Sequence, residues 1–289
     1  MNGQEQSTRY VRFDQDLCIG CASCLRICPT RAIRIRNKKS IRIVDQCIGC
    51  GHCVRVCPAG AVSAASVLPE KIGTDHIALA MVSPVLYAQF PTVMPKDVLL
   101  GLREMGFQHT IDMSYFLEIF QIAAEEFIKR NHFSSEAPWP LISPICPVVV
   151  RLIAFRFPNL LPNVLPVLRP SALMAREVKK RLIADYVAKG ENVVLYYINP
   201  CPTKAQPARH PGGRQAAPVE RALGINDIYP ELRRQVERIR RSNNISFSQT
   251  RFEYETCATA NAAMWGRSGG ELADMDLDRC LAVPGLRET

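Results

Sequence analysis

The sequence lacks an uninterrupted apolar run long enough to cross a membrane as a helix, which takes about 20 residues. Its longest apolar stretches, residues 77–90 and 141–155, are interrupted by proline and, in the second stretch, also by Arg151. The first six residues are polar, so the apolar region of a signal peptide is missing as well. We therefore expect no membrane insertion and predict a cytoplasmic location.

Cysteine, in contrast, is abundant: the chain has 12 cysteines, and eight of them fall between residues 18 and 57. In a reducing cytoplasm they are expected to be thiols or metal ligands rather than disulfides. They form two runs of one pattern, C-x2-C-x2-C-x3-C-P, with the second run 29 positions after the first. The runs are Cys18, Cys21, Cys24 and Cys28, then Cys47, Cys50, Cys53 and Cys57. This repetition indicates an internal duplication.

The spacing within each run is typical of cysteines that bind [4Fe–4S] clusters. Two-residue gaps allow three successive thiolates to surround one cluster, and Gly20, Gly49 and Gly51 permit close approach of the backbone. The fourth cysteine, which is followed by proline, ligates the cluster of the other run. We therefore predict one cluster held by Cys18, Cys21, Cys24 and Cys57, and a second cluster held by Cys47, Cys50, Cys53 and Cys28.

Two other interpretations of the cysteine runs are a zinc site and a disulfide framework. Zinc sites rarely use eight cysteines in two such runs with trailing prolines. The expected compartment disfavours disulfides. With the two-cluster interpretation favoured, about residues 10–66 resemble a bacterial-type two-cluster ferredoxin.

Acidic residues are fewer than basic ones, with 27 against 36, which gives a net charge of +9. Taken alone, this excess suggests an anionic partner such as nucleic acid. Within residues 1–66, however, ten basic residues accompany four acidic ones, and each oxidised cluster with its four thiolates adds a charge of about −2. The excess is better explained by anionic clusters, so we expect no nucleic-acid partner and interpret the basic residues of 231–241 as a solvated helix face.

Beyond residue 69, strand-like and helix-like stretches alternate. Strands are expected at residues 77–82, 107–113, 140–145 and 193–198, and helices at 95–105, 115–129, 148–157, 171–189 and 231–241. Such alternation is typical of α/β layers with a mainly parallel sheet. A β-hairpin is expected over residues 32–44, between the cysteine runs. The sequence thus predicts an α+β two-cluster module (residues 1–68) followed by an α/β domain (residues 69–289).

Two of the remaining cysteines follow predicted strands, at the edge where parallel sheets bind ligands. Cys146 follows residues 140–145 and stands at the start of a predicted helix, whose dipole favours the thiolate. Cys201 follows residues 193–198, with Lys204 three residues further on. Taken singly, each cysteine is more typical of a small buried apolar residue.

The segments around these cysteines change that interpretation. They read Ser143-Pro144-Ile145-Cys146-Pro147 and Asn199-Pro200-Cys201-Pro202-Thr203-Lys204. They resemble the first two signature segments of the large subunit of iron-only ([FeFe]) hydrogenases, T-S-C-C-P and M-P-C-x-x-K. The resemblance takes in residues 111–114, 156–163 and 170–171 and covers about residues 76–265. A preceding two-cluster module is the domain order of that family.

The resemblance implies a hydrogen-activating cluster in the full-length product. Cys146 and Cys201 would ligate its [4Fe–4S] part, and Lys204 would donate to a cyanide ligand of its two-iron part. It also implies an α/β hydrogenase-like domain of two lobes, each a small sheet flanked by helices, with the site in the cleft between them. A ferredoxin or a similar electron carrier is the implied redox partner.

The sequence departs from the family at positions to which the resemblance assigns a role in the reaction. Ile145 stands at the position of the cysteine that relays protons, and Asn199 stands at the position of the methionine. An ungapped alignment from Asp112 places Ala123-Ala124 where the family carries a relay carboxylate pair.

The third signature segment, E-x-M-x-C-x-G-G-C-x-x-G-G, supplies two more cluster cysteines in the family and has no match here. Cys257 and Cys280 lack its glycine pattern and are interpreted as structural. We therefore expect a truncated product that, as given, forms no stable hydrogen cluster.

These observations leave three hypotheses for the function. The leading one is an electron-transfer and redox- or hydrogen-sensing iron–sulfur protein, because the replacement at Ile145 resembles the sensory branch of the family, where a signalling domain follows. The second is a catalytic [FeFe] hydrogenase that reduces protons to hydrogen in the full-length product. The third is a non-catalytic scaffold for iron–sulfur assembly. Whether the protein is an enzyme is left open at this point.

Overall fold

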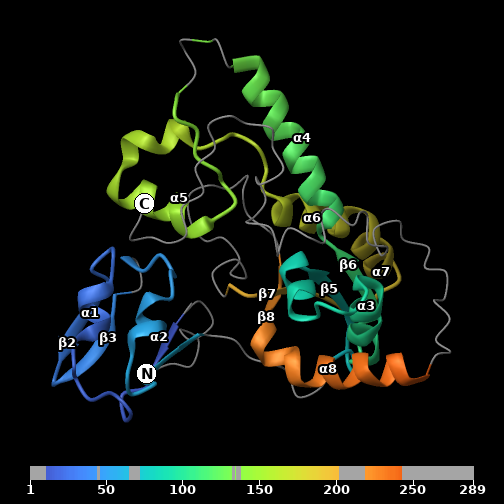
Figure 1. Cartoon of the computed structure of the whole chain (residues 1–289), viewed down its shortest axis with the longest axis horizontal. Helices are drawn as coiled ribbons and strands as arrows, with labels where there is room; N and C mark the ends of the chain where they lie inside the picture. Colours follow the sequence, from blue (N-terminus) through green and yellow to red (C-terminus); the bar gives the residue numbers. More distant parts are fainter. Residues whose placement is uncertain are drawn as a thin grey trace.

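The computed structural model describes residues 11–43, 46–64, 72–131, 134, 138–201 and 219–242. We call residues 11–64 the N-terminal module and the described residues from 72 onward the α/β region; both are shown in Figure 1. Within the described ranges, every helix is too short or too polar to cross a membrane.

The N-terminal module consists of two antiparallel strand pairs and two short helices. Its elements are β1 (Val11–Phe13), α1 (Ser23–Ile27), β2 (Ile33–Arg36), β3 (Lys39–Arg42), α2 (His52–Val56) and β4 (Val62–Ala64). The β2–β3 pair confirms the predicted hairpin, with its turn residues Asn37 and Lys38 at positive φ. The β1–β4 pair was not predicted, because three-residue strands are too short to show alternation.

The two cysteine runs follow the same backbone path, so the duplication in the sequence is also present in the structure. In each run the glycine before the second cysteine has positive φ, 71° at Gly20 and 77° at Gly49. The residue before each short helix is left-handed, and the third cysteine is buried in that helix.

The α/β region is built on one four-stranded sheet. Its strands are β5 (Ile77–Val82), β6 (His109–Asp112), β7 (Val193–Asn199) and β8 (Arg221–Gly224), all parallel, in the order β6-β5-β7-β8. The chain places β6 on one side of β5 and then β7 and β8 on the other side. The direction in which strands are added therefore reverses between β5 and β7. At such a switch point the carboxyl ends of the strands form the crevice where ligands bind, and Cys201 lies two residues beyond the end of β7.

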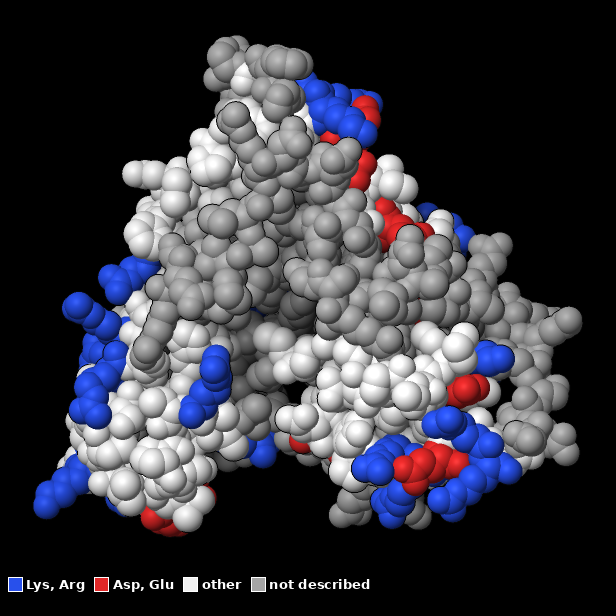
Figure 2. Space-filling view, in the orientation of Figure 1, with Lys and Arg blue, Asp and Glu red and all other residues white. Residues whose placement is uncertain are grey.

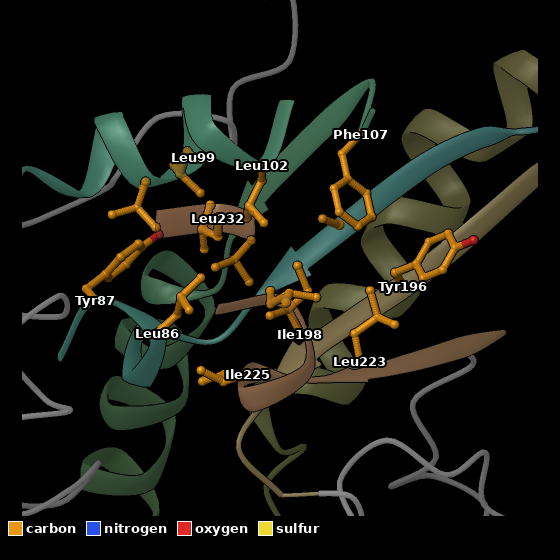
Figure 3. Packing of buried hydrophobic residues seen from close by; sticks show 14 of the residues in the cluster. Leu86, Tyr87, Leu99, Leu102, Phe107, Tyr196, Ile198, Leu223, Ile225 and Leu232 are labelled. Atoms are coloured by element: carbon orange, nitrogen blue, oxygen red, sulfur yellow. The ribbon is translucent and has the colours of Figure 1, made fainter. Parts of the chain in front are cut away.

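Helices cover both faces of this sheet. The helices of the α/β region are η3 (Pro84–Gln89), α3 (Pro95–Glu104), α4 (Ser114–Asn131), α5 (Pro147–Arg156), η4 (Pro158–Asn163), α6 (Pro170–Val178), η5 (Lys179–Ile183), α7 (Ala184–Ala188) and α8 (Ile225–Ser242). Of these, α5 and η4 contribute no residue to the two cores on the sheet. Ala80 of β5 packs in a core with Leu102 of α3 and Leu232 of α8 (Figure 3). Leu79 and Met81, on the opposite face, pack with α4 and α6. Burial on both faces explains why β5 is apolar throughout rather than alternating.

The predicted strand over residues 140–145 is wrong. Only Ile142 forms a bridge there, a single isolated one to Val164. Pro140 and Pro144 lack the N–H groups that a strand ladder requires, which accounts for the failure. Consequently Cys146 does not follow a strand of the sheet, although it does stand directly before α5 as predicted. Within the described residues the α/β region has one sheet, and the second small sheet implied by the family resemblance is not among its elements.

Other differences concern the limits of elements. The helix expected over residues 171–189 is divided into α6, a π-helical turn and α7. Strand β8 was missed, and α8 begins at Ile225, six residues before its predicted start and on the other side of Pro230. The other predicted strands and helices are confirmed within a few residues at each end.

Charge is distributed unevenly over the face of the molecule that Figure 2 shows. Lys and Arg side chains gather on the N-terminal module with few acidic neighbours, whereas acidic and basic side chains alternate on α8 (Figure 2). On α8, Arg233 pairs with Glu237, and Arg234 pairs with Glu231. This pairing agrees with our interpretation of α8 as a solvated helix face.

Candidate metal centre

One cavity of the N-terminal module has an empty volume of about 360 Å³ and is lined by cysteines of both runs. Its cysteines are Cys28, Cys47, Cys50 and Cys53, and we call it the Cys50 cavity. Val11, Phe13 and Ile33 supply an apolar wall. Cys28 reaches this cavity from the first run because it ends α1 and the chain then turns back into β2. These are the four cysteines predicted for the second cluster.

The other cavity has an empty volume of about 330 Å³ and is lined by Cys18, Cys21, Cys24 and Cys57. We call it the Cys21 cavity. Here Cys57, at the end of α2, crosses over from the second run. The structure therefore brings together both sets of four cysteines, with the crossed fourth ligand in each.

The arrangement fits a polynuclear cluster better than a single ion. Each set of four cysteines surrounds a cavity, and among the described residues no three His, Cys, Asp or Glu side chains lie close enough to hold one metal ion. A zinc site needs its four ligands within about 2.3 Å of one point. Cysteines spread around an apolar-walled cavity suit a [4Fe–4S] cube, whose four irons each take one thiolate.

Backbone and side-chain donors approach the sulfur atoms. The N–H of Ser40 donates to Cys18 Sγ at 3.4 Å, and the N–H of Ala32 donates to Cys28 Sγ at 3.2 Å. The Ser40 hydroxyl lies 3.2 Å from Cys24 Sγ. Hydrogen bonds to sulfur stabilise the more negative state of a cluster and are one of the terms that set its reduction potential.

The thiols of the two cavities differ in acidity. Burial raises the pKa of Cys53 to about 12 and also raises the pKa of Cys50. The backbone hydrogen bond from Ser40 lowers the pKa of Cys18, and hydrogen bonding with the Ser23 hydroxyl lowers the pKa of Cys21. Burial thus favours the protonated thiols of Cys50 and Cys53, and cluster binding to them must release protons.

The structure places Cys201 in a tight turn at the carboxyl end of β7. Its backbone N–H donates to Asn199 Oδ1 at 2.8 Å. Asn199 is only 1% exposed, and its Nδ2 has no hydrogen-bond partner among the described residues. The departure at Asn199 was noticed in the sequence, but its contact with Cys201 could not be predicted.

Cys146 caps α5, and the residue before it packs into an apolar cluster. Ile145 is 8% exposed and packs with Phe120 and Ala124 of α4 and with Leu165. Ile145 and Ala124 are two of the three positions that the family resemblance aligns with proton-relay groups, and both belong to this one apolar cluster. Neither Cys146 nor Cys201 lines the Cys21 or the Cys50 cavity.

Other predicted residues lie outside the described part of the chain. They are Lys204, Cys257 and Cys280. Among the described residues, Asp112 at the end of β6 belongs to the segment 111–114 of the family resemblance but was assigned no role of its own from the sequence. Its carboxylate accepts hydrogen bonds from the Tyr87 hydroxyl at 2.8 Å and from the Ser114 N–H and hydroxyl at 2.8 and 2.7 Å. The Asp-x-Ser spacing, which favours such a turn, was the available signal.

Two family models match the chain. The model described as the C-terminal domain of the iron only hydrogenase large subunit matches residues 76–276. The model described as a 4Fe-4S dicluster domain matches residues 10–58. The first match covers well over half of the chain, and the second includes both cysteine runs.

One known protein with a similar sequence is a hydrogenase subunit. The chain is 34% identical over 170 residues to the periplasmic [Fe] hydrogenase large subunit of Nitratidesulfovibrio vulgaris, a match that covers 53% of this chain and 40% of that protein. The chain thus spans about two fifths of the length of that relative.

Two solved structures were also compared. An apo [FeFe]-hydrogenase variant from Chlamydomonas reinhardtii is 18% identical, with a TM-score of 0.44, over 68% of this chain and 52% of that one. A structure on oxygen inactivation of [FeFe]-hydrogenase is 18% identical, with a TM-score of 0.45, over 71% and 54%.

The dicluster match and the two cysteine-lined cavities define the class: this is an iron–sulfur protein. Because the hydrogenase model matches residues 76–276, the chain belongs to the iron-only hydrogenase large-subunit family. The resemblance seen in the sequence is confirmed. The cytoplasmic location stays a prediction, and the relative from Nitratidesulfovibrio vulgaris is named as periplasmic.

Proposed function

We propose that this chain is an electron-transfer protein of the iron-only hydrogenase family, with one [4Fe–4S] cluster in the Cys21 cavity and one in the Cys50 cavity. We further propose that it serves redox or hydrogen sensing rather than fast turnover. An electron-carrier protein as partner and a signalling domain further along the full-length product belong to this proposal, as do Cys146, Cys201 and Lys204 as contacts of a hydrogen-activating cluster.

The electron-transfer part of the proposal rests on the two sets of four cysteines. A cluster bound in such a cavity exchanges one electron at a time. The protein supplies the thiolates, the donors from Ser40 and Ala32 that tune the potential, and the apolar walls that limit water.

The apolar cluster around Ile145 is the single observation that carries the sensing part. Fast turnover requires a group that accepts and returns protons at a matched pKa. Ile145 and Ala124 have no titratable atoms and belong to one apolar cluster with Phe120 and Leu165. A site without this relay can exchange electrons with its surroundings while it exchanges protons slowly, which suits a sensor.

Anaerobic reconstitution tests the cluster assignment. The wild-type chain should bind about eight iron and eight sulfide ions. Paired variants test the crossed ligands: Cys28→Ser combined with Cys50→Ser removes two ligands of one cavity and should leave about four iron ions. Cys28→Ser combined with Cys21→Ser damages both cavities and should leave close to none. Equal iron in the two pairs would contradict the crossed assignment, and absence of iron in the wild type would contradict the proposal.

A catalytic hydrogenase is the second candidate, favoured by the 34% identity to a hydrogenase large subunit. Hydrogen evolution by the full-length product, matured with the two-iron cofactor, separates the two. The sensing proposal expects slow evolution and a change in the iron–sulfur spectrum on exposure to hydrogen. Fast evolution by the wild type would overturn the sensing proposal in favour of the catalytic one. A fast rate only after Ile145→Cys would show that the relay alone is missing.

A further inference from the structure

Helix α5 reaches from the α/β region to the N-terminal module through two arginines. Arg151 Nη1 donates to the carbonyl oxygen of Ile48 at 3.2 Å. Arg156 donates to the carbonyl oxygen of Pro29 from Nε at 3.2 Å and from Nη2 at 2.9 Å. In Figure 1, α5 lies beside the N-terminal module, in agreement with these contacts.

One acceptor lines the Cys50 cavity, and the other directly follows a cysteine that lines it. Ile48 lines that cavity and follows Cys47, whereas Pro29 follows Cys28. The two arginines therefore hold one segment from each cysteine run, at the two places where ligands enter the same cavity. The Cys21 cavity has a cation of its own module instead, Lys39, whose Nζ donates to the carbonyl of Cys18 at 2.6 Å.

The same helix carries Cys146 at its N-terminus. Arg151 and Arg156 lie five and ten residues further on, about 7.5 and 15 Å along the helix axis. One rigid element thus connects the predicted hydrogen-cluster ligand with the wall of the Cys50 cavity. A change in how tightly the two arginines bind these carbonyl groups would therefore change the position of Cys146.

We infer that Arg151 and Arg156 form a redox-sensitive latch between the N-terminal module and the α/β region. The inference rests on the proposed cluster in the Cys50 cavity. When a donor protein transfers one electron to that cluster, the donor is oxidised and the cluster is reduced. The charge of the cluster and its four thiolates then changes from about −2 to about −3. Both guanidinium groups are then attracted more strongly, so the latch tightens.

The coupling is reciprocal. If reduction tightens the latch, the latched state must favour the reduced cluster and raise its reduction potential. The oxidation state of the cluster in the Cys50 cavity thereby determines how tightly α5 is held, next to Cys146. This gives the sensing function a route that needs no proton relay.

Hydrogen–deuterium exchange on the anaerobically reconstituted full chain tests the latch. In the wild type, amides of α5 should exchange about two- to fivefold more slowly after reduction with dithionite than after oxidation, the range for a surface charge pair. In the double variant Arg151→Gln/Arg156→Gln the difference between the two states should vanish. Arg156→Lys keeps the positive charge and should retain part of the difference in exchange between the two redox states. It replaces the double variant in this test if the double variant folds poorly. Arg181→Gln, which removes another exposed helix arginine, is the control.

An EPR-monitored redox titration supplies a second readout. In the double variant the midpoint of one cluster should fall while the other stays unchanged. Equal exchange of α5 in both redox states of the wild type, or an unchanged midpoint in the double variant, would overturn the latch while leaving the proposed function intact. A wild type that binds no iron would overturn both.

Discussion

The N–H of Cys201 donates a 2.8 Å hydrogen bond to Oδ1 of Asn199, two residues earlier in the chain. This bond closes a turn at the carboxyl end of β7, beside the switch point of the sheet. The amide of Asn199 is buried, and within the part of the chain that the structure describes its Nδ2 has no partner. An unsatisfied buried donor costs about 1–3 kcal/mol, so the turn at Cys201 is maintained at the expense of stability.

The variant Asn199→Asp tests this turn. It keeps the oxygen that accepts from Cys201 but places a carboxylate in a buried position with one donor. We expect a loss of about 3 kcal/mol in the free energy of unfolding at neutral pH. Burial raises the folded pKa of such a carboxyl above its unfolded value, so the loss should shrink as the pH falls toward about 4.

Urea unfolding at several pH values measures this effect. Asn192→Asp, at the exposed residue directly before the same strand, is the matched control and should change stability by less than about 0.5 kcal/mol. If Asn199→Asp were as mild as the control, the amide would not be buried as described.

The glycines of the cysteine runs provide a second test. Gly20 and Gly51 both have positive φ, 71° and 75°. A Cβ at Gly20 would collide with the backbone oxygen of Lys38, whereas a Cβ at Gly51 would meet nothing within 4 Å. Moreover Ala22, the equivalent of Gly51 in the first run, already has a φ of 63°.

We therefore expect Gly51→Ala to cost about 1 kcal/mol and to keep the full iron content. Gly20→Ala should displace the β2–β3 turn, which brings Lys39 and Ser40 to Cys18, and lose about half of the iron. Iron analysis after reconstitution distinguishes the two. An equal loss in both variants would show that backbone strain, rather than the collision, is responsible.

The sequence alone predicted much of the site, because cluster spacing is a local property. The crossed sets of four cysteines follow from one pattern and its repetition, and both occur together in the structure. Strands such as β5 were predicted because their apolar runs are long. The segment over 140–145 failed because apolar content was weighed above Pro140 and Pro144, which exclude a ladder.

What the sequence could not supply were contacts between distant segments. Nothing in the residues near Arg151 or Arg156 indicates that their partners are carbonyl groups more than a hundred positions away. The meeting of Ile145 with Ala124 likewise depends on how α4 packs, which no local pattern records.

A third prediction concerns pH. Because burial raises the pKa of Cys53 to about 12 from a reference of 9.0, the cluster-free fold requires the neutral thiol. A pKa raised in the folded state stabilises the protein fully below the unfolded value and ceases to do so as the pH rises through the folded value. The cluster-free chain should therefore lose stability between about pH 9 and pH 12.

Thermal unfolding of the cluster-free chain across this range measures the loss, and Cys53→Ala should flatten it. Cys21→Ala is the control, since the pKa of Cys21 is lowered and its contribution changes at lower pH. A pH profile of Cys53→Ala identical to that of the wild type would contradict the burial of this thiol.

The last prediction asks how accessible the position of Ile145 is to protons. A cysteine introduced there would lie among Phe120, Ala124 and Leu165, where burial disfavours the thiolate. Alkylation requires the thiolate and access to water. Ile145→Cys should therefore be alkylated by iodoacetamide at least about tenfold more slowly than Ile122→Cys. Ile122 is 69% exposed and lies on α4, the helix that Ile145 contacts. Peptide mass spectrometry resolves the two sites. Equal rates would show that water and protons reach Ile145, and the sensing proposal would then lose its main support.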